Sequence, residues 1–145
     1  MPKQTVGVIE RCHLPELEIT DLHVRVDTGA KTSSLHVDNI QEFDKGKDLW
    51  VSFDIHPDYH HVDVIVRRQA KVKAIRTIKS SNATKENRYV IDTDIVMGTE
   101  RWTIELTLTD RSGMTYLMLL GREAMIGRLV VDPELEYVLK PQSLS

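Results

Sequence analysis

The residues with the clearest potential for chemistry lie in positions 24–35, which read VRVDTGAKTSSL. Apolar and polar residues alternate from Leu22 to Val26, so we expect a strand that ends by delivering Asp27 into a loop. Gly29 follows two residues later and can adopt backbone angles that other residues avoid. The carboxylate of Asp27 can cap this turn through its own oxygens, or it can act as a general acid or base.

Several strings along the chain resemble segments of one protein family. VDTGA at residues 26–30 resembles the active-site segment of aspartic proteases of the retropepsin branch, and LLGR at residues 119–122 resembles the element that opens their C-terminal helix. Together with VDTGAKTS at 26–33, ELTLTDR at 105–111 and MLLGREAM at 118–125, these strings are similar to the bacterial family of small retropepsin-like proteins, often labelled ATP-dependent zinc proteases. The resemblance extends roughly over residues 8–141.

The resemblance implies a closed β-barrel homodimer in which each chain supplies one Asp-Thr-Gly to a shared site. Asp27 and its symmetry mate would form the catalytic dyad. Thr28 would hold the two loops together, while Gly29 and Ala30 would present their backbone to the substrate. The monomer would then be inactive.

Paired carboxylates can perform peptide hydrolysis without a metal, a nucleotide or another cofactor. Two carboxylates a few ångströms apart do not readily ionise together, so one retains a proton while the other acts as a base. The base would take a proton from a water molecule that attacks the peptide carbonyl, and the protonated partner would donate to the carbonyl oxygen.

Basic residues suggest which substrate such a site would take. Lys31, Arg88, Arg111 and Arg122 are candidates for attracting an acidic peptide. Some members of the family are found alongside ligases that append glutamates to proteins, so the resemblance makes an oligoglutamate tail a plausible substrate. Viral retropepsins usually carry an acidic residue at the position of Lys31. Lys31 would either favour the ionised form of Asp27 or be a solvated loop lysine. For Arg122 the resemblance implies a second role, which we prefer: bracing the loop that follows Asp27, as the equivalent arginine does in retropepsins.

Two other classes of function stay open. One is a non-catalytic dimer that binds an acidic peptide or a protein partner in the same cleft. The other is a zinc hydrolase built on His56, His60 and His61, but Pro57 interrupts this cluster and its flanks have strand character, so we favour a solvated turn. A thiol nucleophile at Cys12 is disfavoured, because neighbours on a strand point to opposite faces and His13 would point away.

Period-two alternation predicts most of the elements that position these residues. It indicates strands at 102–108, 89–95 and 22–26 and a hairpin of 49–55 with 62–66, the last being a candidate flap over the site. Residues 114–120 suit a strand buried on both faces, 122–126 a short helix ended by Gly127, and 137–139 a last strand. Residues 38–48 and 79–87 are expected to be surface loops. These strands predict an all-β fold, either a barrel or a sandwich. Of the two, the family resemblance implies a closed β-barrel of the retropepsin type with one short C-terminal helix.

Composition sets the remaining expectations. A length of 145 residues with 41% hydrophobic residues suits one retropepsin-like domain over residues 1–145. A net charge of −3 gives no sign of a basic surface for nucleic acid, and no apolar run is long enough for a membrane span. With one cysteine and no signal-peptide pattern at the start, we expect a cytoplasmic protein.

Overall fold

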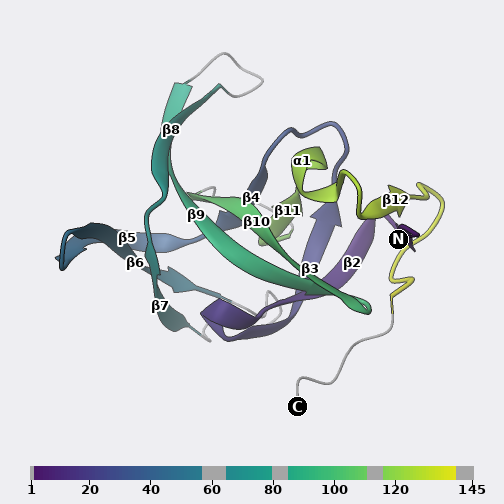
Figure 1. Ribbon diagram of the computed structural model, residues 1–145, viewed down its shortest axis with the longest axis horizontal. Coiled ribbons are helices and arrows are strands. Elements are labelled where there is room, and N and C mark those ends of the chain that lie inside the picture. Colours follow the sequence, from purple (N-terminus) through teal and green to yellow (C-terminus); the bar gives the residue numbers. More distant parts are fainter. Residues whose placement is uncertain (1, 57–64, 80–84, 111–115, 140–145) are drawn as a thin grey trace.

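The computed structural model describes residues 2–56, 65–79, 85–110 and 116–139. It is mostly strand (65%), with a closed six-stranded β-barrel and one short α-helix among the described residues (Figure 1). The expected all-β fold, a closed barrel with one short helix, is therefore confirmed. None of the helices in these residues is long and apolar enough to cross a lipid bilayer.

Short strands account for most of the elements along the chain. The strands are β1 Gln4–Val6, β2 Ile9–Leu14, β3 Ile19–Val26, β4 Ser33–His36, β5 Asp38–Lys45, β6 Asp48–Ile55, β7 Val66–Lys71, β8 Ala74–Lys79, β9 Lys85–Met97, β10 Glu100–Thr109, β11 Met118–Leu120 and β12 Leu129–Val131. A 3₁₀ turn, η1, covers Pro15–Leu17, and the α-helix α1 covers Arg122–Met125.

The barrel closes because β9 pairs with strands at both ends of the ring. The strand order is β10-β4-β11-β3-β2-β9, and β9 pairs antiparallel with β10 to complete it. β3 and β11 run parallel, as do β4 and β10, so segments far apart in sequence lie next to each other around the Asp27 loop. Alternate side chains of these strands fill the interior, among them Leu22, Ile91 and Leu106, each at most 1% exposed.

Three further pieces lie outside this ring. β8 continues the sheet beyond β9, and the β8–β9 hairpin projects from the barrel at the top of Figure 1. β5, β6 and β7 form a separate three-stranded antiparallel sheet. β1 and β12 form a parallel pair that joins the N-terminal segment to the segment after α1.

A buried carboxylate fastens the C-terminal segment to the start of the barrel. Glu10 is fully buried, and its side chain accepts hydrogen bonds from the backbone N–H groups of Gly7 at 2.7 Å, Val138 at 3.0 Å and Leu139 at 3.1 Å. Gln4 makes a second tie, because its side chain donates to Met97 O at 3.0 Å and accepts from Thr99 N at 3.2 Å. Backbone donors bonded to a carboxylate are among the stronger protein hydrogen bonds.

Most predicted elements are confirmed, and several boundaries change. The strands expected at 22–26, 49–55, 89–95 and 102–108 are present as β3, β6, β9 and β10, and the helix expected at 122–126 is present as α1. β6 pairs antiparallel with β7 as expected, but β7 begins at Val66, and residues 57–64 lie outside the described residues. Of the strand expected at 114–120, the described part contains β11.

Three expectations were wrong. Residues 38–45 form β5 and not a loop, because an edge strand paired with β6 can leave its charged side chains in water. The expected loop at 79–87 is too wide, since β8 extends to Lys79 and β9 begins at Lys85. The last strand is β12, not residues 137–139, where Tyr137 has a left-handed φ of 52° that does not suit a strand.

Candidate active site

Asp27 lies at the first position after β3 and is partly buried. Its backbone N–H donates to Leu120 O on β11 at 3.0 Å, so the strand pairing fixes where the loop begins. Its Oδ1 accepts a hydrogen bond from Gly29 N at 2.9 Å, and Ala30 N donates to Asp27 O at 3.2 Å. The carboxylate therefore caps its own turn. The part of the chain that the structure describes offers no hydrogen-bond partner to Oδ2, which leaves this oxygen available to a water molecule or a second carboxyl group.

The entry into α1 holds the loop from behind. Arg122 N donates to Ala30 O at 2.8 Å and Glu123 N to Lys31 O at 3.2 Å, while Arg122 Nη1 donates to Gly29 O at 3.2 Å. These bonds satisfy loop carbonyls with donors from a helix start. The contact required for the bracing role of Arg122 is thus present.

Gly121 is required by the close approach of α1 to the loop. Its N–H donates to Ser33 Oγ at 2.9 Å. A Cβ at this position would lie 2.5 Å from both the carbonyl carbon and the oxygen of Thr32, closer than real Cβ contacts. Only glycine lets the two backbones pack this tightly.

The loop presents its other residues to solvent. Thr28, Gly29 and Lys31 are exposed, and Ala30 is half-buried. Lys31 Nζ lies 3.8 Å from Glu123 Oε1, so its charge is directed towards α1. Arg122 is also exposed, and its hydrogen bond to Gly29 O places its guanidinium group beside the loop.

The structure does not bring Arg88 to this loop. Its guanidinium group, with a side chain 7% exposed, is bound to Glu86 at 3.2 Å. On β9, Arg88 precedes Tyr89, which pairs with Leu108 near the Thr109 end of β10. Thr109 in turn pairs with His36, and His36 lies at the opposite end of β4 from Ser33. Arg88 is also the register partner of Arg76 on β8, and its role in substrate binding stays a prediction. Arg111 lies outside the described residues.

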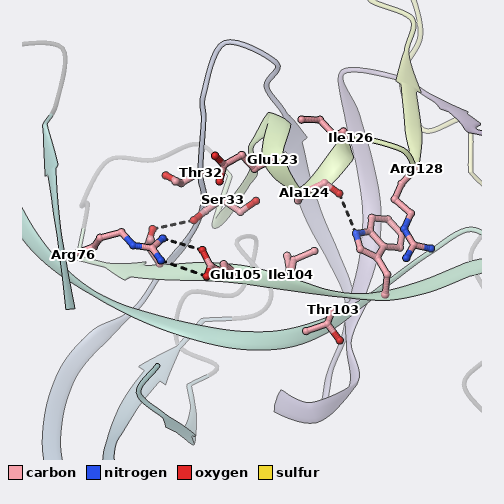
Figure 2. Close-up of a pocket in the computed structure, with 12 residues that line it drawn as sticks. Thr32, Ser33, Arg76, Thr103, Ile104, Glu105, Glu123, Ala124, Ile126 and Arg128 are labelled. Carbon is pink, nitrogen blue, oxygen red and sulfur yellow. Dashed lines mark hydrogen bonds and ion pairs between the residues drawn. The ribbon is translucent and has the colours of Figure 1, made fainter. Parts of the chain in front are cut away.

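A cavity of about 350 Å³ lies beside the loop, lined by Thr32 and Ser33, by Glu123 of α1 and by Arg76 and Glu105 of the neighbouring strands (Figure 2). Arg76 on β8 binds Glu105 on β10 in a two-point ion pair, with distances of 2.9 Å and 3.3 Å. Sequence reasoning missed Arg76 because β8 itself was not predicted. Its position also brings β8 to the cavity beside the Asp27 loop (Figure 2), whereas the turn of the expected β6–β7 flap, residues 57–64, lies outside the described residues.

The ion pairs of Glu105 predict acid sensitivity. Hydrogen bonds from Arg76 and Lys73 lower the pKa of Glu105 to about 2. Because the pKa of Glu105 is lower in the folded than in the unfolded protein, this carboxyl group stabilises the fold above about pH 4.5. This stabilisation is lost as the pH falls towards 2. Since the side chain is 35% exposed, solvent screening reduces the effect to about 1 kcal/mol. We expect Glu105→Gln to lower the free energy of unfolding by about this amount at pH 7, measured by urea denaturation, and by less at pH 3.

Glu136→Gln provides a matched control for that measurement, because Glu136 is exposed. It should leave the free energy of unfolding unchanged at both pH values. An equal loss of stability at pH 7 and pH 3 for Glu105→Gln would contradict the assigned ion pairs.

Cys12 has the environment of a structural thiol. It is 1% exposed and lies 3.9 Å from the sulfur of Met118, while the neighbouring His13 accepts from Asp21 N at 3.0 Å. Burial raises the pKa of the Cys12 thiol to about 12. We expect native protein at pH 8 to react with iodoacetamide about 10³-fold more slowly than free cysteine, measured by mass spectrometry, and at the ordinary rate in urea. Rapid native labelling would reopen the thiol alternative.

The histidine cluster is placed only in part. His56 Nε2 lies 2.9 Å from Asp38 Oδ2, whereas His60 and His61 lie outside the described residues. His56 follows β6 in the separate three-stranded sheet. Among the described residues it makes no contact with the Asp27 loop.

Comparison with known proteins decides the family. A family model described as "Retropepsin-like aspartic endopeptidase RimB" matches residues 5–142. The chain belongs to the RimB-like family. In this RimB-like chain, the family match covers the Asp27 loop, the LLGR string and all twelve strands but the first residue of β1.

Several relatives of the RimB-like chain are much longer. A protein from Parasynechococcus marenigrum, named "Probable alpha-L-glutamate ligase", is 48% identical over 132 residues, which are 91% of this chain and 28% of that protein. Proteins with the same name from Desulfotalea psychrophila and Shewanella halifaxensis are 46% and 45% identical and are covered to 30% and 31%. The RimB-like chain thus spans less than a third of these relatives, whose name applies to the whole protein.

A solved structure has the same architecture. The crystal structure of a protein of unknown function from Legionella pneumophila is 28% identical to this chain, with a TM-score of 0.79, and the match covers 96% of this chain and 100% of the other. The RimB-like fold is therefore also seen in a crystal.

Proposed function

We propose that the protein is an aspartic peptidase whose active site forms when two chains bring their Asp27 side chains together. The observation that carries this proposal is the geometry of the loop: Asp27 follows a half-buried strand, caps its own turn through Oδ1 and keeps Oδ2 available, on a loop fixed by α1. Membership of a retropepsin-like aspartic endopeptidase family supports it.

Pairing of two chains is part of the proposal, because one chain contains a single Asp-Thr-Gly. The exposed Thr28 and Gly29 would lie against the partner loop, and Thr28 would link the two loops. Exposed large hydrophobic side chains also gather in the segment after α1, which favours burial against a second copy. They are Ile126, Val130, Leu135, Tyr137 and Val138.

The chemistry follows from two carboxyl groups sharing one proton. The ionised Asp27 would remove a proton from a water molecule as that water attacks the peptide carbonyl carbon. The protonated Asp27 of the other chain would donate to the carbonyl oxygen, giving a tetrahedral intermediate. Collapse of this intermediate breaks the C–N bond, with a proton passed to the leaving amine.

We propose acidic, glutamate-rich chains as the substrate. The long relatives are named as alpha-L-glutamate ligases, and a segment that hydrolyses glutamyl bonds next to one that forms them would trim the product. Lys31, Arg76 and Arg122 are cations close to the loop or its adjoining cavity. Lys31 is bound to Glu123, and Arg76 is bound to Glu105. A carboxylate of the substrate would therefore take the place of one of these protein carboxylates.

A second candidate function is binding without cleavage. The ligase names of the relatives favour it, because a module that merely holds a growing glutamate tail would also serve a ligase. In that case the loop would bind the acidic chain and Asp27 would only cap its turn. A third candidate, zinc-dependent hydrolysis at the histidine cluster, requires a metal in the reaction itself.

One assay separates these functions. The full chain is incubated with a peptide ending in several α-linked glutamates, and with the same peptide ending in glutamines, from pH 4 to pH 8, with and without EDTA. Products are measured by mass spectrometry, and the mass in solution by ultracentrifugation. We expect cleavage of the glutamate peptide by a dimer, with an initial rate insensitive to EDTA. Tight binding of that peptide with no cleavage at any pH would favour the binding module, and immediate loss of cleavage with EDTA the metal hydrolase.

A further inference from the structure

A group of metal-ligating side chains lies away from the Asp27 loop. His36 ends β4, Asp38 begins β5 and Asp110 follows β10, and one ligand atom of each lies within 4.8 Å of the others. His36 Nε2 is 3.5 Å from Asp38 Oδ1, and His56 Nε2 is 2.9 Å from Asp38 Oδ2. We propose that His36, Asp38 and Asp110, with His56 behind Asp38, bind one divalent transition-metal ion per chain, and that Zn²⁺ fits the site best.

The sheet topology explains why these four residues meet. His36 and Asp38 are two residues apart on an extended backbone, so they share a face while the buried Val37 points to the other. Val37 N donates to Thr109 O at 2.9 Å, which brings the next residue, Asp110, alongside. Asp54 pairs with Asp38 in the β5–β6 register, so His56 leaves β6 at the same edge.

The electrostatics of the cluster favour a cation. Asp38 and Asp110 place two carboxylates within 4.8 Å, and their mutual repulsion is relieved when a positive charge lies between them. The imidazole of His36 adds a nitrogen ligand of the kind that most often binds metals in proteins. The side chains of His36, His56 and Asp38 are 12%, 22% and 32% exposed, so solvent screens the site only in part.

The distances suit a small ion with nitrogen and oxygen ligands. Tetrahedral Zn²⁺, with bonds of about 2.0–2.2 Å, separates its ligand atoms by about 3.4 Å. The distance between His36 and Asp38 is already close to this value, at 3.5 Å. Asp110 is exposed and can move inwards by about 1 Å to complete the set. His56 would then orient the Asp38 carboxylate, as outer-shell groups commonly do around bound metals.

The site is placed to stabilise the fold and not to activate the water at Asp27. Ser33, whose Oγ accepts from Gly121 beside the Asp27 loop, begins β4, and His36 ends it. At the usual strand rise this places the two ends about 10 Å apart. A bound ion would connect the ends of β4, β5 and β10. The proposal thus stands independently of the peptidase activity.

The test uses the purified full chain, stripped of metal with a chelator and dialysed. We expect Zn²⁺ to bind with a stoichiometry of one per chain, by calorimetric titration and elemental analysis. At about a hundredfold excess over the dissociation constant, Zn²⁺ should raise the melting temperature by about 9 °C. Absence of binding at micromolar Zn²⁺, or binding without a rise in melting temperature, would overturn the proposal.

Variants assign the ligands. Asp110→Asn, at an exposed position that should not disturb folding, and His36→Gln should each weaken Zn²⁺ binding at least about 100-fold, and His56→Gln about 10-fold. Asp27→Asn should leave Zn²⁺ binding unchanged. The double variant His60→Ala/His61→Ala should also retain it. Loss of binding in that double variant, with retention in Asp110→Asn and His36→Gln, would overturn the assignment.

Discussion

Asp27→Asn is expected to lower the rate of hydrolysis of a glutamate-tailed peptide by about 10³-fold while leaving the fold and the dimer intact. An amide has no carboxylate to take a proton from water, and two facing amides cannot share a proton. The amide oxygen of the variant can still accept the hydrogen bond that Asp27 Oδ1 receives from Gly29 N at 2.9 Å, so the turn should persist. The measurement is the initial rate by mass spectrometry, with circular dichroism and solution mass recorded on the same sample.

Asp44→Asn is the matched control for that variant. Asp44 is an exposed residue of the β5–β6 hairpin, outside the barrel ring, and it carries the same charge. Its substitution should leave the rate unchanged. Hydrolysis that continues at the parent rate in Asp27→Asn would refute the dyad, whereas a folded monomer in the parent protein would refute the shared site.

Gly121→Ala is expected to lower the free energy of unfolding by about 2–4 kcal/mol. The added methyl group would lie 2.5 Å from the Thr32 carbonyl and 2.9 Å from the carbonyl carbon of Lys31. Both neighbours are backbone, so α1 or the Asp27 loop must shift. Because the same helix holds Gly29 and Ala30 through Arg122, the shift should also reduce hydrolysis more than the stability loss alone would. Urea denaturation and initial rates at a temperature where the variant is folded measure the two effects.

Gly46→Ala separates steric collision from the general cost of replacing a glycine. Gly46 has a φ of +66°, and a Cβ added there would meet no atom of the described residues within 4 Å, so only backbone strain of about 1 kcal/mol is expected. It lies in the β5–β6 turn, and hydrolysis should not change. Equal losses of stability in the two variants would show that Gly121 approaches Thr32 less closely than the structure places it.

The strands that carry the site could be predicted because their burial is one-sided. β3 and β10 alternate in burial along much of their length, and the sequence alternates with them. β5 was missed because it is an edge strand whose exposed side chains make its composition resemble a loop. β8 was missed for a similar reason: within the described ranges it pairs with β9 alone, and Ile75, a large apolar residue, is 55% exposed.

In the candidate site, too, the sequence predicts the local contacts and not those between distant strands. The turn chemistry of Asp27 and Gly29 is local, so the string itself predicts it. The contact between Arg122 and Gly29 joins residues 93 positions apart and was anticipated only through family resemblance. Arg76 and the partners of Arg88 depend on the register of β8, β9 and β10, which no pattern within one strand specifies.

The ties made by Glu10 and Gln4 bring the first and last described parts of the chain to one place. A Cβ on Gly98, in the β9–β10 turn, would lie 2.2 Å from Gln4 Oε1 and 3.1 Å from Leu139 Cδ2, so both ends reach the same turn. A polypeptide that enters and leaves a fold at neighbouring points can be circularly permuted or carried inside a longer chain without reordering its sheet. A permuted chain in which a short connector joins Leu139 to Gln4, with new termini opened at the β5–β6 turn, should therefore fold into the same barrel.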